Sequence, residues 1–188
     1  MTPWFEIYRE RMNQRYLDHV ASKYAPFIEN LFGIRGFNFT EIGCGAGNIT
    51  RILREMHGAH GNSRVYGYHL IDACPKMLSL AIENNPQDNC IFQCGDVKNA
   101  TIPESNLVYS HGLLEHFDDF DIRGIVHRMK YVAATQVHYV PSALYEAPSR
   151  GDERLMEPDQ WREILSGLGR VTITPFNNGL DLILRIER

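Results

Sequence analysis

Residues 37–47 read Phe37-Asn38-Phe39-Thr40-Glu41-Ile42-Gly43-Cys44-Gly45-Ala46-Gly47, an apolar-rich run that ends in a glycine-rich loop. The run predicts a strand over residues 37–43, and residues 48–56 have the apolar spacing of an amphipathic helix. A strand, a tight glycine loop and a helix together open an α/β unit. Because glycine has no Cβ, this loop can turn sharply and approach a ligand closely.

The same alternation of strand and helix continues toward the C-terminus. We expect strands at residues 65–71, 89–94, 107–110, 136–140, 171–176 and 180–186, and helices at residues 75–83, 120–129 and 158–168. Asn177-Asn178-Gly179, between the last two strands, is a hairpin signal. The expected fold class is therefore α/β: a doubly wound, seven-stranded sheet, mostly parallel with an antiparallel C-terminal hairpin strand, and with helices on both faces.

The N-terminal residues precede this pattern. Apolar residues recur every three or four positions through residues 5–24, which predicts one amphipathic helix that Pro26 interrupts. A short second helix is expected over residues 27–32. We therefore expect a single domain over residues 1–188, with an N-terminal helical cap (1–33) and a core (34–188). The aromatic side chains of the cap either line a substrate pocket or belong to the core: Trp4, Tyr8 and Tyr16.

Composition narrows the class of protein. The chain has 188 residues, of which 44% are hydrophobic, and a formal net charge of −4, without long runs of charge. These values favour one globular domain and make a broad nucleic-acid surface unlikely. No apolar stretch is long enough to span a membrane, and the first residues lack the pattern of a secretory signal, so we expect a cytoplasmic protein. The four cysteines have no zinc spacing and are expected as free thiols, while the oligomeric state stays open.

The spacing of the glycines separates two classes of ligand. A dinucleotide-binding GxGxxG motif would need glycine at position 48, where the chain has Asn48, and a GxxxxGK[ST] phosphate loop is absent. An NAD-dependent oxidoreductase is therefore disfavoured. Instead, Glu41 stands two residues before a GxGxG stretch. This arrangement resembles the first motif of the class I S-adenosylmethionine-dependent methyltransferases, whose fold is Rossmann-like, and later segments look like the type-11 and type-12 branch.

Three further segments carry the resemblance. In this family an acid that ends the second strand binds the ribose hydroxyls, and Asp72, followed by Ala73-Cys74-Pro75-Lys76-Met77-Leu78, stands in that place. Cys94-Gly95-Asp96-Val97 matches the segment that binds adenine. Residues 107–117 resemble the fourth strand and the loop beneath the methionine moiety. The resemblance implies S-adenosyl-L-methionine as cofactor, S-adenosyl-L-homocysteine as product, and these cofactor-binding residues: Glu41, Gly43, Cys44, Gly45, Gly47, Asp72, Ala73, Met77, Asp96, Val97, Ser110, His111 and Gly112.

The acidic residues also have structural interpretations. Glu41 can cap the glycine loop, Asp72 can cap the helix that begins near Pro75, and Asp96 can serve only as a turn residue. The chain departs from the family pattern in two places. Val132-Ala133-Ala134 replaces the usual Pro-Gly-Gly turn before strand five, and Asn106 stands where aspartate is common.

Two histidines are candidate catalytic residues. An imidazole beside the transferred methyl group can act as general base, which makes His111 and His116 the candidates, although the ring of His111 can equally serve for packing. Glu115-His116 resembles half of a Glu-x-x-Glu-His metal set, but Gly112 stands where the first glutamate would be, so no metal is predicted. His57 and His60 are expected to lie in a glycine-rich loop and to be solvated.

The expected activity is methyl transfer to an O, N or C atom of an acceptor, mainly by proximity and orientation. A small-molecule acceptor is favoured because no basic patch is present. Its pocket would be built from the N-terminal helix, the loop after strand four and residues 141–157, which carry Tyr145, Glu146, Arg150, Asp152, Glu153 and Arg154 and can form a lid. The alternative is a catalytically silent S-adenosylmethionine-binding regulatory or partner subunit, which the same cofactor motifs fit equally well.

Overall fold

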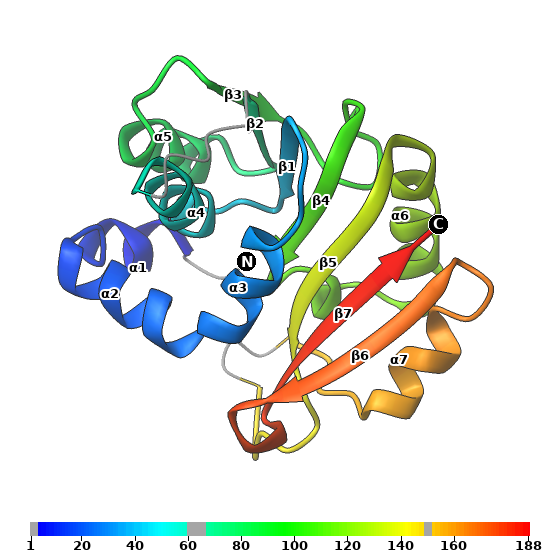
Figure 1. Cartoon of the computed structure of the whole chain (residues 1–188). Coiled ribbons are helices and arrows are strands. Elements are labelled where there is room, and N and C mark those ends of the chain that lie inside the picture. The colour runs from blue at the N-terminus through cyan, green and yellow to red at the C-terminus, as the bar shows by residue number, and fades with distance from the viewer. Residues whose placement is uncertain (1–3, 60–66, 149–151) are drawn as a thin grey trace.

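The computed structural model describes residues 4–59, 67–148 and 152–188 (Figure 1). Several residues of the sequence analysis lie outside the described residues. They are Met1, Thr2 and Pro3, His60, Val65 at the expected start of the second strand, and Arg150 of the expected lid.

Seven strands form one sheet in the order β3-β2-β1-β4-β5-β7-β6 (Figure 1). Their bounds are β1 Asn38–Ile42, β2 Gly67–Asp72, β3 Cys90–Cys94, β4 Ser105–His111, β5 Ala133–Pro141, β6 Arg170–Phe176 and β7 Asp181–Glu187. The first five strands pair in parallel, whereas β7 pairs antiparallel with both β5 and β6. The predicted α/β fold class, with its antiparallel C-terminal hairpin, is confirmed. The strand order reverses between β1 and β4, and ligands of open α/β sheets bind at the carboxyl ends of strands at such a point.

Helices cover both faces of the sheet. Their bounds are α1 Trp4–Glu10, α2 Gln14–Lys23, α3 Ala25–Phe32, α4 Asn48–Ala59, α5 Pro75–Asn84, α6 Asp119–Val132 and α7 Pro158–Ile164, with short 3₁₀ turns at Leu114–His116 (η1) and Asn177–Gly179 (η2). Apolar residues of α2 to α5 pack in one cluster with Phe39 and Tyr109 of the sheet. Residues of α6 and α7 pack in a second cluster with Ile42 and Val108. Neighbouring residues of a strand thus face opposite layers, as the period of two requires.

The single helix predicted over residues 5–24 is wrong, because the structure has two helices there. The side chain of Asn13 accepts a hydrogen bond from the backbone N–H of Tyr16 at 3.0 Å and caps the start of α2. An asparagine side chain competes in this way with the helical backbone, so the chain breaks between α1 and α2. Pro26 does not end a helix. It lies in the first turn of α3, where a proline is tolerated.

One other expectation needs correction, and one departure from the family pattern can be described. His57 is neither in a loop nor solvated: it lies in the last turn of α4, and its side chain is buried, stacks on Phe32, and bonds through Nδ1 to the hydroxyl of Tyr68 at 2.6 Å. No separate turn replaces the Pro-Gly-Gly segment before strand five. The helix α6 ends at Val132 and β5 begins at Ala133, so the change of direction falls on the peptide between them.

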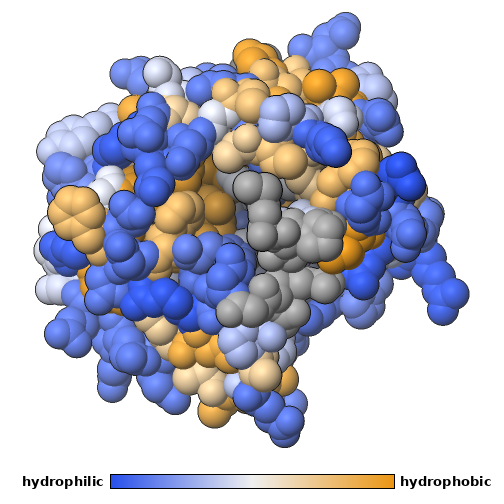
Figure 2. All heavy atoms as spheres, turned by 180° about the vertical axis from the view of Figure 1, so that it is seen from behind, coloured by the Kyte–Doolittle hydropathy of each residue, from blue (hydrophilic) through white to orange (hydrophobic). Residues whose placement is uncertain are grey.

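The surface mixes polar and apolar side chains. Seen from behind, hydrophilic side chains cover much of the molecule, with hydrophobic residues in smaller groups between them (Figure 2). Within the described ranges, no helix combines the length and the apolar composition that crossing a membrane requires.

Candidate active site

The glycine loop, residues 43–47, connects β1 to α4 at the point where the strand order reverses. Gly43, Gly45 and Gly47 have φ values of 61°, 53° and 68°, in the left-handed region that favours glycine. At Gly47 a Cβ would also lie only 2.6 Å from Asn85 Nδ2. The glycines are therefore required by the conformation of the loop, and the loop lies at the expected ligand edge of the sheet.

Glu41, the last residue but one of β1, is buried below this loop. Its Oε2 accepts hydrogen bonds from the hydroxyl and, at 3.3 Å, from the backbone N–H of Thr50. Burial raises the pKa of Glu41 to about 8. One carboxyl oxygen of Glu41 thus has the structural role of accepting hydrogen bonds from the protein itself. The other, Oε1, has no hydrogen-bond partner within the described part of the chain, which leaves it free to accept from a ligand.

Asp72, at the end of β2, joins the first two sequence motifs. Its Oδ2 accepts from the backbone N–H of Gly45 and its Oδ1 from that of Cys74, both at 2.8 Å. The N-cap residue of α5 is Cys74, so Asp72 makes the turn before the helix rather than its cap. Burial raises the pKa of Asp72 above its ordinary value. Each carboxylate oxygen retains acceptor capacity after one such bond.

The third motif is tied to the second through the backbone. The N–H of Gly95 donates to the carbonyl of Asp72 at 2.9 Å. Asp96 is exposed, and its Oδ1 accepts from the backbone N–H of Lys98 at 2.9 Å, as in the turn interpretation. Val97 is buried in the core, while Ala73 is exposed. Residues 41–47, 72–73 and 95–97 are thus brought together at one edge of the sheet.

Helix α1 packs on this edge. Its apolar side chains and Met12 contact a small cluster formed by Ala46 of the glycine loop with Met77 and Leu80 of α5; the side chains from the N-terminal segment are Trp4, Phe5, Tyr8 and Met12. Cys44 is buried on the opposite side, in the cluster with α3 and α4. The aromatic side chains of the N-terminal helices therefore have two locations. Those of Trp4 and Tyr8 pack against the cluster that includes Ala46 of the glycine loop, and that of Tyr16 packs against the larger core cluster.

Two consecutive residues at the end of β4 face opposite layers. The hydroxyl of Ser110 is buried and bonds to His138 Nδ1 at 2.9 Å, and burial lowers the pKa of His138 to about 3. The side chain of Ser110 is therefore engaged inside the protein, so a cofactor contact from this residue would come from its backbone. His111 points to the other layer. The backbone N–H of Gly112, which follows with φ 68°, donates to the carbonyl of Tyr139 at 3.1 Å.

His111 lies within a group of aromatic rings. It stacks on Tyr139, with ring centroids 4.5 Å apart and planes at 18°, and meets Tyr24 edge-on at 4.2 Å. Its Nε2 atom is buried and has no hydrogen-bond partner among the residues described. Burial lowers the pKa of His111 to about 4, so the ring is neutral at pH 7. A neutral imidazole with an unpaired nitrogen is competent to accept a hydrogen bond or a proton.

Asp181 anchors the same group from the start of β7. Its Oδ1 accepts from the hydroxyls of Tyr139 at 2.8 Å and Tyr145 at 2.9 Å, and its Oδ2 accepts from Asn177 Nδ2 at 2.6 Å. The carboxylate is completely buried. These bonds fix the ring of Tyr139, on which His111 stacks, and they attach the expected lid to the core at Tyr145.

Glu115 and His116 follow in η1. Glu115 is 2% exposed, burial raises its pKa to about 8, and its Oε2 is a second buried atom that has no partner within the described ranges. His116 Nδ1 lies 3.1 Å from Asp152 Oδ1, and the ring meets Trp4 of α1 edge-on at 6.2 Å. Within residues 4–59, 67–148 and 152–188, no three His, Cys, Asp or Glu side chains are grouped to hold a metal.

The end of the expected lid is fastened to the loop after β4. The backbone N–H of Arg154 donates to the carbonyl of Glu115 at 2.9 Å, and its guanidinium donates to the carbonyl of Phe117 at 2.7 Å and to Asp119 Oδ1 at 2.6 Å. A cavity of about 300 Å³ lies beside Arg154, between α6 and α7, away from the glycine loop. It is lined by Asp119, Arg123, Arg154, Met156, Gln160, Glu163 and Ile164.

Several residues of this site have no recognisable signal in the sequence. Tyr24 precedes Pro26 in what looks like a helix break, Tyr139 alternates regularly in a strand, and Asp181 follows a hairpin turn. Each reaches His111 only through the pairing of β4, β5 and β7 with the N-terminal helices. Glu115 has a weak signal, because an acidic residue that follows two leucines after a buried strand is unusual.

Comparison with known proteins agrees with this geometry. A sequence model of a methyltransferase domain family matches residues 39–136, just over half of the 188 residues. No curated protein sequence matches significantly. The DhpI–SAH complex superposes with a TM-score of 0.73 at 18% identity, covering 97% of this chain and 93% of that one. A SAM-dependent methyltransferase from Aquifex aeolicus gives 0.70 at 14% identity, covering 93% and 98%.

Human N-acetylserotonin methyltransferase in complex with SAM gives a TM-score of 0.69 at 14% identity. That match covers 93% of this chain but 54% of the human protein. A match to a putative O-methyltransferase from Nostoc punctiforme covers 56% of that protein. The chain therefore spans about half the length of these two proteins. The structural matches share the fold, and the family match covers the glycine loop and the strands around it. The chain therefore belongs to the class I S-adenosylmethionine-dependent methyltransferases.

Proposed function

We propose that this protein methylates an oxygen, nitrogen or carbon atom of a small-molecule acceptor, and that the acceptor binds between the end of β4 and the N-terminal helices. S-adenosylmethionine supplies a methyl group on a positively charged sulfur, which already makes that methyl electrophilic. The protein then has to bind both reactants in line, exclude water, and take up a proton where the acceptor carries one.

The cofactor-binding roles follow from the acceptor atoms at the edge of the sheet. The carboxylate of Asp72 has acceptor capacity left for the two ribose hydroxyls, beyond the N–H groups of Gly45 and Cys74. The exposed carboxylate of Asp96 is suited to an amino group of adenine. Both printed hydrogen bonds of the Glu41 carboxyl go to Oε2, so within the described residues Oε1 keeps acceptor capacity for a positively charged amino group. These residues fit the cofactor of the family.

The observation that carries the acceptor site is the buried Nε2 of His111, which has no hydrogen-bond partner in the described part of the chain. Stacking on Tyr139 and the edge contact with Tyr24 hold the ring, so its nitrogen is positioned before an acceptor arrives. For an O–H or N–H acceptor, Nε2 would take the proton that the acceptor atom loses as its bond to the methyl carbon forms and the sulfur–methyl bond breaks, with S-adenosylhomocysteine as the neutral leaving group. His116 is the weaker candidate for this role, because its Nδ1 already has a hydrogen-bond partner in Asp152.

Two features support a small acceptor. The net charge is −4 and no basic run is present, which does not favour nucleic acid. The N-terminal helices bring tyrosine rings toward the same region: Tyr8 meets Tyr16 at 6.3 Å, and Tyr24 meets His111. Aromatic walls with a few polar groups are typical of small-molecule pockets. Among structurally similar proteins are a human N-acetylserotonin methyltransferase and a pyocyanin biosynthetic protein.

The test has two stages. Calorimetric titration of the purified protein with S-adenosylmethionine, S-adenosylhomocysteine and NAD should show binding of the first two and none of NAD. Incubation with S-adenosylmethionine and a panel of phenols, amines and activated carbon acids should then release S-adenosylhomocysteine with at least one acceptor class. Failure of the folded protein to bind either S-adenosyl compound overturns the proposal. Binding without turnover on any acceptor would identify a silent cofactor-binding subunit instead.

A further inference from the structure

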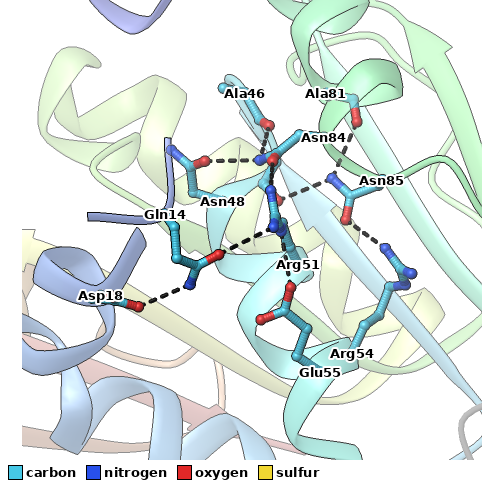
Figure 3. A network of polar contacts seen from close by, with 11 residues as sticks. Gln14, Asp18, Ala46, Asn48, Arg51, Arg54, Glu55, Ala81, Asn84 and Asn85 are labelled. Carbon is cyan, nitrogen blue, oxygen red and sulfur yellow. Dashed lines mark hydrogen bonds and ion pairs between the residues drawn. The ribbon is translucent and has the colours of Figure 1, made fainter. Parts of the chain in front are cut away.

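A network of polar side chains from α4 and the end of α5 forms hydrogen bonds with the glycine loop (Figure 3). Asn84 and Asn85, at the end of α5, are 6% and 0% exposed. Asn84 Nδ2 donates to the carbonyl of Ala46 at 3.0 Å and to Asn48 Oδ1 at 2.8 Å. Asn85 Nδ2 donates to the carbonyl of Gly47 at 3.1 Å and to that of Ala81 at 3.1 Å. Two consecutive side-chain amides thus bind two consecutive carbonyls of the loop.

Two arginines of α4 complete the arrangement. Arg51 Nη1 donates to Asn84 Oδ1 at 2.8 Å, and Arg54 Nη1 donates to Asn85 Oδ1 at 2.9 Å (Figure 3). Because a guanidinium only donates, each amide must direct its oxygen to the arginine and its nitrogen to the loop. The arginines therefore determine the orientation of both asparagines. Arg51 also extends the network outward, with Nη2 at 3.4 Å from Gln14 Oε1 of α2.

These contacts act on the peptide planes of the loop. A carbonyl held by a buried amide fixes its peptide plane and hence the direction of the N–H in the same plane. The contact at Gly47 is so close that a side chain at this position would collide with Asn85. Neither asparagine belongs to the four segments that resemble the family motifs. The carbonyl of Gly47 also accepts from the backbone N–H of Arg51 in α4 at 3.0 Å, whereas that of Ala46 accepts no backbone hydrogen bond within the described residues, so the contact of Asn84 supports the inference more strongly.

We propose that Asn84 and Asn85 are positioning residues for cofactor binding, which hold the glycine loop in the conformation that binds S-adenosylmethionine. The inference rests on the proposed function in one respect, namely that residues 43–47 bind the cofactor. Its consequence is that affinity for the cofactor depends on two amides that do not touch it.

Asn84→Asp and Asn85→Asp test the inference, with S-adenosylhomocysteine as the probe. Each variant keeps the shape of the side chain and its contact with arginine, but an ionised carboxylate cannot donate to the loop carbonyl and repels it. We expect each variant to bind S-adenosylhomocysteine at least about tenfold more weakly, a factor that corresponds to about 1.4 kcal/mol. Because each substitution also leaves buried carbonyls without their amide donor, the melting temperature without ligand should fall, so binding is measured at a temperature where the variants and the wild type are all folded; hydrogen exchange of the amides in residues 43–48 should increase.

Asn30→Asp is the matched control. Its Oδ1 accepts from Arg185 Nη1 at 3.3 Å, so this variant also places a carboxylate beside an arginine, but away from the glycine loop. It should bind S-adenosylhomocysteine like the wild type. Equal affinity in Asn84→Asp, Asn85→Asp and the control overturns the inference while the proposed function stands. If the aspartate variants do not fold, Asn84→Ser and Asn85→Ser provide the same comparison without added charge. A wild type that does not bind the probe contradicts the proposed function itself.

Discussion

Asp72 Oδ2 accepts a hydrogen bond from the backbone N–H of Gly45 at 2.8 Å, which links the carboxylate at the end of β2 to the glycine loop at the end of β1. The other oxygen, Oδ1, holds the turn before α5 through Cys74. One side chain therefore connects two segments that lie 27 residues apart in the sequence. In the proposed function the same carboxylate binds the ribose, so it organises the site and also contacts the cofactor.

Asp72→Asn should separate these roles only in part. The amide group of asparagine would place an N–H against the N–H of Gly45 or Cys74, which costs about 1–3 kcal/mol of folding free energy. We expect S-adenosylhomocysteine binding to fall by more than tenfold, beyond what this loss of stability explains, in calorimetric titrations of folded protein. Asp88→Asn, at an exposed carboxylate after α5, is the control and should bind normally. Unchanged binding in Asp72→Asn would remove Asp72 from the cofactor site.

The two buried glutamates predict how stability depends on pH. Burial raises the pKa of Glu41 and of Glu115 to about 8, above the ordinary value of 4.5. The folded state therefore keeps these protons over a range where the unfolded state releases them. Their contribution to stability is complete below about pH 4.5 and is lost as the pH rises toward 8, with a slope of up to about 1.4 kcal/mol per pH unit for each group.

Glu115→Gln replaces one of these two titratable carboxyl groups with an amide that does not titrate. The free energy of unfolding of the variant, relative to the wild type, should increase between pH 5 and pH 8, measured by urea denaturation at each pH. The change is expected because a glutamine stays neutral at every pH, whereas Glu115 Oε2 is buried without a partner among the described residues. Glu104→Gln, at an exposed carboxyl, controls for the loss of one negative charge. A difference that does not vary with pH would contradict the shifted pKa of Glu115.

Whether the sequence predicts a part of the fold or the site depends on how far apart along the chain the interacting residues lie. The glycine loop, Asp72 and Asp96 stand directly after strands whose apolar pattern is clear, so local periodicity and turn chemistry place them correctly at one edge of the sheet. The break between α1 and α2 has no such signal, because the apolar spacing runs through it unchanged and the capping bond of Asn13 at the start of α2 is visible only in the structure.

The acceptor side was not predictable in the same way. Tyr24 and His111 are 87 positions apart, and Asp181 lies on a hairpin whose insertion beside β5 is decided by the packing of the whole sheet. Asn84 and Asn85 have the local appearance of a polar helix end, and their role depends on carbonyls 38 residues away. Spacing rules report which residues share a local face. They do not report which buried polar groups meet across elements.

Asp181→Asn should destabilise the fold strongly. The wild-type carboxylate accepts from two tyrosine hydroxyls and from Asn177 Nδ2, whereas the variant has one acceptor oxygen, so its amide nitrogen must take the place of one of these acceptors. We expect a loss of about 2–4 kcal/mol in unfolding free energy, because a completely buried group loses one of its two acceptor atoms and the hydrogen bonds around it must rearrange. Tyr145→Phe removes only one of the three bonds and should cost about 1 kcal/mol. Chemical denaturation measures both, and equal effects would contradict the central place of Asp181.

His111→Phe should distinguish catalysis from packing. Phenylalanine keeps an aromatic ring against Tyr139 and Tyr24, so S-adenosylhomocysteine binding and stability should change little. The ring nitrogen is lost, however, and turnover of an O–H or N–H acceptor that the wild type methylates should fall by about 10²–10⁴. Because burial lowers the pKa of His111 to about 4, its base form persists above that pH, and its titration should not limit the wild-type rate between pH 5 and 9. Full activity of the variant would show that His111 serves for packing alone, whereas a rate that falls together with cofactor affinity would show that the substitution disturbs the loop after β4 rather than proton transfer.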